Sequence, residues 1–187
     1  MRAMTLLIML ASLSACATAT PRLTNDVSTY SRWAAARKPT TYAFERLSSQ
    51  QRWGERQQQF EDAARGALEA AGFTEATDRS SADVLVQVGA RVGAKRTLYS
   101  GAETRHRPRM PAHDFAQDPV WVTIELREVA VLIRERESGA TLYGTRATNR
   151  GHSVSSPEIV AAMFDAALSD FPNATENPRQ VTVDLNR

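Results

Sequence analysis

The chain contains 187 residues, of which 42% are hydrophobic and 24% are charged. This length suits one domain on the usual scale of about 100 to 200 residues, and the composition indicates neither a disordered chain nor a protein with many membrane spans. The formal net charge is only +2, because acidic residues nearly balance the basic ones. A nucleic-acid-binding domain gathers its basic residues on one face, so we expect no nucleic-acid partner.

The N-terminal residues have the three-part layout of a secretory signal. Arg2 supplies a positive charge, residues 5–11 form an apolar run, and small residues follow as far as Ala15. This layout is typical of a signal peptide that is removed from the mature protein. The apolar run is much shorter than the roughly 20 residues that span a bilayer. We therefore predict a signal peptide over residues 1–15 rather than a retained transmembrane helix.

Cys16 is the only cysteine of the chain and follows this leader directly. Leu13, Ser14 and Ala15 before it match the lipobox of bacterial lipoproteins, in which the thiol receives diacylglycerol before the signal peptidase cuts. The resemblance predicts lipidation of Cys16 and a domain held at the membrane by acyl chains. Ala17 stands where lipoproteins retained in the inner membrane of enteric-type bacteria carry Asp, which implies the outer membrane, facing the periplasm. The alternative is a plain secreted protein with an accidental early cysteine.

The first half of the mature chain combines strand signals with one helix. Residues 16–26 are small and polar and predict a flexible tether, so the domain is expected over residues 27–173. Residues 27–32 and, more strongly, 40–44 have the alternation and β-branched or aromatic character of strands. Helical spacing of apolar residues predicts a helix over about 54–71, which Gly72 ends. Residues 82–88 then predict a largely buried strand.

The second half begins with a segment that lacks periodicity, residues 94–118, and we predict a long loop there. Residues 120–136 carry the longest strand signal. Their apolar residues change from even to odd positions, which predicts a bulge near Arg127 and Glu128. Residues 141–149 are expected to return as the partner strand of a hairpin.

A second helix follows, for which either Ser155 or Ser156 is a suitable N-cap and Pro157 a suitable first-turn residue. Pro172 ends it, and residues 174–187 are predicted to form a polar C-terminal tail, although alternating apolar residues there are also consistent with an edge strand. Together these elements predict an α+β fold. We expect a mostly antiparallel sheet of about five strands with two helices packed on one face, forming a two-layer sandwich.

Three short motifs give the chain a family resemblance. They are residues 41–44 before the first helix, Gly72 and Phe73 followed by residues 82–86, and the hairpin that leads into a helix ending at Phe171 and Pro172. With the lipobox, this pattern resembles the bacterial envelope lipoproteins of the domain of unknown function 4136 over about residues 27–173. The resemblance implies an envelope location and a small α/β sandwich, and it brings no catalytic residues with it.

The densest basic stretch lies in the predicted loop and comprises Lys95, Arg96, Arg105, Arg107 and Arg109. The planar guanidinium donors of arginine suit phosphates, so one hypothesis is a contact for anionic glycolipid such as lipopolysaccharide. The alternative is a solvated loop with no ligand.

No pattern in the sequence predicts an active site or a metal centre. The candidate metal ligands are His106, His113, Asp114 and His152, which lack the short spacing of known metal sites. Glu125 and Glu128 are three residues apart on a predicted strand, so they should point to opposite faces as solvated charges rather than act as a glycosidase pair. A nucleophile elbow and a phosphate-binding glycine loop are also missing. We expect neither catalysis nor a cofactor.

The large aromatic side chains are those of Trp33, Trp53 and Trp121. Trp121 alternates with Val122 and Ile124, so we expect it on the less buried face of the sheet, either at an interface or packed under the loop.

The sequence thus predicts a non-enzymatic lipoprotein, anchored to the membrane by lipid, that binds a protein or another envelope component in assembly or maintenance. The alternatives are a carrier or binder of anionic glycolipid that uses residues 95–109, and an unrecognised hydrolase. The sequence leaves the oligomeric state open.

Overall fold

The computed structural model describes residues 21–100, 120–151 and 156–185. Its strands are β1 (Arg22–Ser31), β2 (Thr41–Phe44), β3 (Thr74–Glu75), β4 (Val84–Ser100), β5 (Val120–Glu135), β6 (Thr141–Gly151) and β7 (Thr175–Asp184). The helices are α1 (Ser48–Gln51), α2 (Gly54–Ala70) and α3 (Pro157–Leu168). The predicted α+β class is confirmed.

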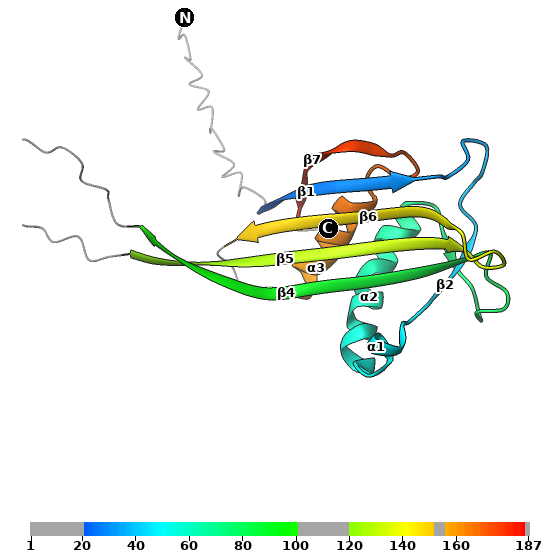
Figure 1. Cartoon of the computed structure of the whole chain (residues 1–187), viewed down its shortest axis with the longest axis horizontal. Coiled ribbons are helices and arrows are strands. Elements are labelled where there is room, and N and C mark those ends of the chain that lie inside the picture. Colours follow the sequence, from blue (N-terminus) through cyan, green and yellow to red (C-terminus); the bar gives the residue numbers. More distant parts are fainter. Residues whose placement is uncertain (1–20, 101–119, 152–155, 186–187) are drawn as a thin grey trace, which may run out of the picture.

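The strands form one sheet of seven in the order β3-β2-β4-β5-β6-β1-β7 (Figure 1). In the part of the sheet ordered β4-β5-β6-β1-β7, each strand runs antiparallel to its neighbours. β2 pairs in parallel with both β3 and β4. The prediction of about five strands was therefore too low. The two-residue strand β3 is too short to show a period in the sequence, and β7 lies at the opposite edge within the predicted tail 174–187.

The sheet also begins earlier in the chain than we predicted. β1 starts at Arg22, so residues 22–26 of the predicted tether pair with β7, with Arg22 opposite Asp184. Inward and outward residues alternate strictly from Arg22 to Tyr30. The sheet therefore extends beyond both ends of the predicted domain, residues 27–173.

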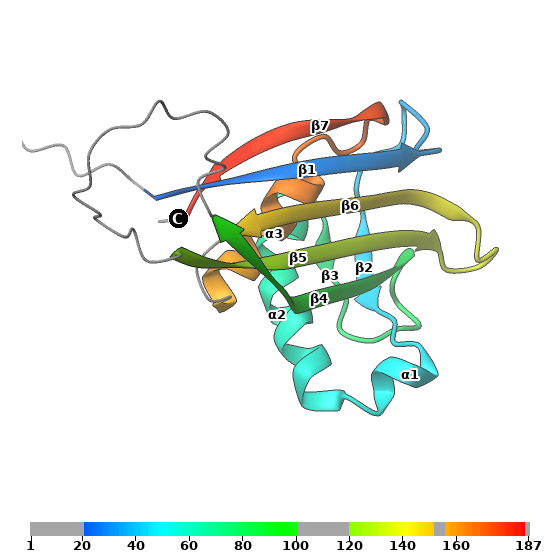
Figure 2. The same ribbon diagram turned by 60° about the vertical axis from the view of Figure 1, so that its left-hand side comes forward.

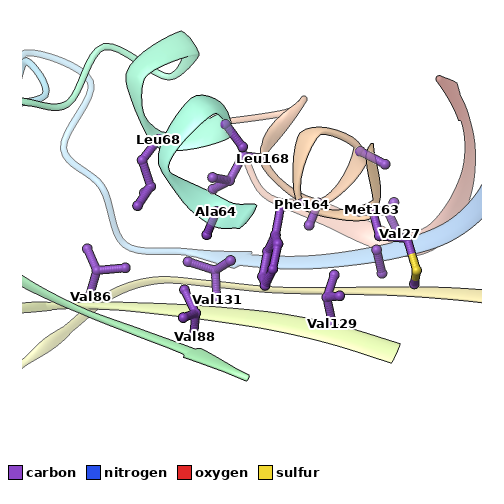
Figure 3. Close-up of a cluster of buried hydrophobic side chains, with 14 of the residues drawn as sticks. Val27, Ala64, Leu68, Val86, Val88, Val129, Val131, Met163, Phe164 and Leu168 are labelled. Atoms are coloured by element: carbon purple, nitrogen blue, oxygen red, sulfur yellow. The ribbon is translucent and has the colours of Figure 1, made fainter. Parts of the chain in front are cut away.

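The core lies between one face of the sheet and the helices α2 and α3. Valines of the sheet point toward the small and apolar residues of the two helices, among them Ala64, Leu68 and Phe164 (Figure 3). Ser156 caps α3 by accepting a hydrogen bond from the backbone N–H of Ile159, and Pro157 follows in the first turn, as predicted. We call the sheet face under these helices the core face.

The irregularity predicted in β5 lies in the neighbouring strand. The register of β4 against β5 shifts between Val92 and Ala94, and Gly93 between them has a left-handed φ of 102°. β4 then continues to Ser100 opposite Val120, so residues 94–100 of the predicted loop belong to the sheet. Residues 101–118 of that loop lie outside the described residues.

Candidate functional site

One face of the sheet carries no helix or strand in the described part of the chain, although Ala76 and Ala82 cover it at Ala43 and Leu85. Helices α2 and α3 lie together on the core face, behind the sheet in Figure 1, and the described residues place no helix or strand over the other face. Turning the molecule shows the same arrangement (Figure 2). We call this second surface the open face.

A trough of about 670 Å³ crosses the open face over β1, β6, β5 and β4. The register of the strands places its residues in two rows that run across the sheet. One row consists of Ser28, Arg146, Ala130 and Gly89, and the next of Tyr30, Gly144, Leu132 and Gln87. The trough is shallow and largely open to solvent, and its volume is within the range of about 300–1,000 Å³ of common ligand sites.

Small residues keep the floor of the trough low. Gly89 and Ala130 are direct partners on β4 and β5, and Gly144 lies one row further on β6. A methyl group on Gly89 would approach nothing closer than Gln50 Nε2 at 3.9 Å, and one on Gly144 would meet Leu132 Cδ1 at 3.6 Å. Both are ordinary contacts, so packing within the chain does not demand glycine at either position.

The backbone does not demand glycine there either. The left-handed glycines of the described residues are Gly72, Gly93 and Gly139, so Gly89 and Gly144 have φ values that other residues adopt readily. A glycine inside a strand costs about 0.5–1 kcal/mol relative to alanine. Such glycines often mark a place where a ligand or another backbone comes close to the sheet.

An amide pair forms one wall of the trough. Gln87 Nε2 donates to Gln50 Oε1 at 3.2 Å, which directs the other amide atom, Gln87 Oε1, away from Gln50. Gln50 is itself held firmly, because its Nε2 donates to the Val88 carbonyl at 2.8 Å and its Oε1 accepts from Leu47 N at 2.8 Å. Within the described residues Gln87 Oε1 accepts no hydrogen bond, so it is available to a ligand.

β2 pairs with β4 only from Val84 to Val86. The chain then leaves the edge of β4, and the short helix α1 places Gln50 beside the next residues of that strand. Beyond that point the edge of β4 presents its carbonyl groups. Gln50 and Gln57 both donate to the Val88 carbonyl, at 2.8 and 3.0 Å. They satisfy and cover part of an edge that would otherwise attract another strand.

The opposite wall carries a guanidinium and an aromatic ring. Arg146 lies with its Nε 3.6 Å from Glu128 Oε1, and its side chain remains 61% exposed. Tyr30 is 46% exposed, and the guanidinium carbon of Arg32 lies 5.7 Å from the centre of its ring. Both residues therefore keep a large part of their surface for contact with another molecule.

A different polar cluster is buried on the core face of the same sheet. Arg127 is fully buried, and its Nη2 lies 3.2 Å from Glu125 Oε2 while its Nη1 donates to Asn149 Oδ1 at 2.8 Å. Asn149 Nδ2 in turn donates to the Thr24 carbonyl at 2.7 Å. A Cβ at Gly151 would lie 3.0 Å from Arg127 Nη1, so glycine leaves room for the guanidinium.

This cluster corrects the prediction that Glu125 is a solvated charge. Glu125 is only 8% exposed, because the regular alternation of β5 directs it and Arg127 to the core face. Glu128 does lie on the opposite face, as predicted, where it pairs with Arg146. The opposed directions of Glu125 and Glu128 exclude this pair as a glycosidase dyad.

Two buried tyrosines belong to the aromatic core. Burial raises the pKa of both Tyr42 and Tyr143 to about 12, so both hydroxyls stay protonated in the physiological range. Trp33 is buried among Phe73 and Phe171, with ring centres 5.6 and 4.9 Å away. These residues build the core.

The described residues that line the trough are not among the predicted site residues. Lys95 and Arg96 lie in β4, opposite Glu125 and Ile124, and their side chains are outside the described part. Also outside it are Leu13, Ser14, Ala15, Cys16, Arg105, Arg107, Arg109, His106, His113, Asp114 and His152. The described residues contain no group of three or more His, Cys, Asp or Glu that would hold a metal ion, and no helix long and apolar enough to span a bilayer.

The other predicted aromatic residues are placed in part. Trp53 is 65% exposed before α2, and Trp121 lies in β5 with its side chain outside the described part. The trough residues were missed altogether. Glycine within the predicted strand 141–149, at position 144, and directly after the predicted strand 82–88, at position 89, was the signal available for them.

Comparison with known proteins identifies a family and a fold. A model of the family described as Domain of unknown function (DUF4136) matches residues 26–173. No curated protein matches the chain. A solved PDZ domain protein from Parabacteroides distasonis ATCC 8503 is similar with a TM-score of 0.52 and 15% identity, over 86% of this chain and 38% of that one. The chain thus spans well under half of that protein's length.

The dodecamer of PelC from Paraburkholderia phytofirmans has a TM-score of 0.46 at 15% identity, over 76% of this chain and 96% of that one. At these identities the likeness to the first structure concerns the fold alone.

Proposed function

Because the chain belongs to the family of domain of unknown function 4136, we propose that it is an envelope lipoprotein whose domain binds a partner without catalysing a reaction. In this proposal lipid on Cys16 anchors it to the outer membrane, facing the periplasm. The domain serves envelope assembly or maintenance as a binding module. The observation that carries the binding role is the trough on the open face.

The anchor and the fold are compatible in their dimensions. Arg22, the first residue of β1, lies six positions after Cys16 in the sequence. At about 3.3–3.6 Å per residue, that segment reaches at most about 22 Å. A lipid on Cys16 would therefore hold the start of β1 close to the membrane surface.

The open face supports binding because the main hydrophobic core lies on the other face of the sheet. The trough combines a floor of small and apolar residues with a few hydrogen-bonding side chains at its walls, which is the usual character of a ligand site.

The anchor is tested by separating inner and outer membranes from cells that produce the wild-type chain or the variant Cys16→Ala. We expect the wild-type chain in the outer-membrane fraction, with diacylglycerol on its N-terminal peptide in mass spectrometry, and loss of the Cys16→Ala variant from that fraction. Equal outer-membrane recovery of both chains would contradict the anchor.

Ala17 gives a matched test of sorting. By resemblance to lipoproteins of enteric-type bacteria, Ala17→Asp should move the lipidated chain to the inner membrane, whereas Ala17→Ser should leave it in the outer membrane. If the two variants distribute identically, position 17 does not direct sorting in this protein.

A further inference from the structure

We propose that the trough binds a strand of the cell-wall glycan, with a sugar ring on Tyr30, an acetamide group at Gln87 and a carboxylate at Arg146. The inference rests on the proposed function, since it names the ligand of a module that faces the periplasm. It concerns residues that the basic-loop hypothesis does not include.

The two strand glycines show that something approaches the sheet at this point. Gly89 and Gly144 have ordinary φ values, and a methyl group on either would make only normal contacts within the chain. Neither the backbone nor the packing of the described residues explains them. A flat ligand that comes close to the backbone of β4 at Gly89 and of β6 at Gly144 does explain them, because a side chain at either position would lift it away.

The side chains at the walls of the trough indicate which chemical groups that ligand carries. An exposed tyrosine ring offers an apolar surface to the C–H face of a sugar. Gln87 Oε1 is directed by the bond from Gln87 Nε2 to Gln50, so it is ready to accept from the N–H of an acetamide group. The terminal nitrogens of Arg146 suit a carboxylate, because a guanidinium forms paired hydrogen bonds with it.

The charge of the open face favours an acidic ligand. Its guanidinium groups in and around the trough outnumber its carboxylates: Arg32, Arg91 and Arg146 against Asp26 and Glu128. Cell-wall glycan carries both acetamide groups and carboxylates on a chain of sugar rings. From β1 to β4 the trough crosses three strand spacings, about 14 Å, which a short stretch of such a chain covers.

The position of the trough argues against other occupants. An extended peptide binds by adding a strand to a sheet edge, where backbone groups are free, whereas the backbone groups under the trough pair with neighbouring strands. An acyl chain on this open face would leave one side in water and would gain nothing from Gln87 or Arg146.

The test uses the full chain purified in detergent and measures its co-sedimentation with purified cell-wall sacculi. Chitin serves as a glycan with acetamide groups and no carboxylates, and carboxymethyl cellulose as one with carboxylates and no acetamide groups. We expect saturable binding to sacculi that is at least about tenfold tighter than to either polymer. Equal binding to carboxymethyl cellulose would reduce the site to general charge attraction and overturn the proposal.

Variants locate the binding in the trough. Arg146→Ser should weaken binding to sacculi about tenfold. Arg150→Ser removes the same charge from the same strand and face, outside the trough, and should leave binding unchanged. Gly144→Val should abolish binding by filling the floor, and its thermal unfolding shows whether it folds. Arg146 is exposed, so its variant remains informative if Gly144→Val does not fold.

Failure of this inference is distinguishable from failure of the proposed function. If the wild-type chain does not sediment with sacculi, or if Arg146→Ser and Arg150→Ser weaken binding equally, the glycan site is wrong. The anchor on Cys16 would still stand on its own fractionation result.

Discussion

Replacing Arg127 by methionine should destabilise the protein strongly, although the new side chain is apolar and similar in length. Arg127 is fully buried and pairs with Glu125 at 3.2 Å and with Asn149 at 2.8 Å. Removing one partner of a buried ion pair costs about 3–5 kcal/mol, because the remaining charge stays buried and loses the attraction of that partner. Since whole domains are stable by only about 5–15 kcal/mol, this is a large fraction of the total.

Urea unfolding at neutral pH measures the effect. With an m-value of about 2 kcal/mol/M, a loss of 4 kcal/mol lowers the midpoint by about 2 M. The matched control is Arg150→Met on the exposed face of β6, which should change stability by less than about 0.5 kcal/mol. The double variant Glu125→Gln with Arg127→Met should recover part of the loss, because no buried charge then remains from the pair.

The argument is refuted if Arg127→Met costs less than about 1 kcal/mol, or if the double variant is less stable by the full sum of the two single losses. Either result would mean that Glu125 does not depend on Arg127 for its burial.

Three further predictions concern single elements of the fold. Gly66→Ala, within α2 and with no atom within 4 Å of the added methyl group, should raise stability by about 0.5–1 kcal/mol in thermal unfolding. Ser156→Ala removes the acceptor for Ile159 N at the start of α3 and should cost about 1 kcal/mol by the same assay. The Thr41 hydroxyl, 2.8 Å from the Asp83 carboxylate, holds the pKa of Asp83 below its usual range, so NMR titration should find that pKa closer to the usual value in Thr41→Val. Because the folded pKa is the lower one, this stabilisation is present above the unfolded pKa and is lost as pH falls through the folded value.

Long periodic elements were predictable from the sequence. α2 was expected over about 54–71 and occupies Gly54–Ala70, and the hairpin of β5 and β6 lies where its alternation indicated. Ser156 and Pro157 marked the start of α3 because their chemistry at a helix start is local. These elements are determined by neighbours in the sequence.

Strands at the edges of the sheet were predicted less well. β3 has two residues and forms by pairing with β2, so its own sequence is too short to show the alternation of a strand. β7 lies in a segment whose polar composition resembles a tail but whose alternating apolar residues were also consistent with an edge strand, and it forms by pairing with β1 from Arg22 onward. In both cases the strand forms because a partner strand is available to pair with it.

The change of phase in β5 shows why a correct pattern led to a wrong structure. A bulge in β5 and a regular β5 with polar residues on its core face predict the same sequence of apolar positions. The structure has the second arrangement, since Arg127 on the core face finds Glu125 on its own strand and Asn149 on β6. The choice depended on a partner from another strand, which alternation within β5 does not reveal.

The trough was not predicted, although its glycines are visible in the sequence, because it too depends on contacts between strands. Gly144 lies in a segment that was predicted as a strand and Gly89 directly follows another, and each alone is a weak position in its strand. Only the register, with Gly89 opposite Ala130 and Gly144 opposite Leu132, brings them to one floor on the open face. If a ligand is what keeps these positions small, Gly89→Ala should stabilise the free protein by up to about 1 kcal/mol while weakening its binding to sacculi. A variant that gains stability and keeps full binding would show that the floor plays no part in recognition.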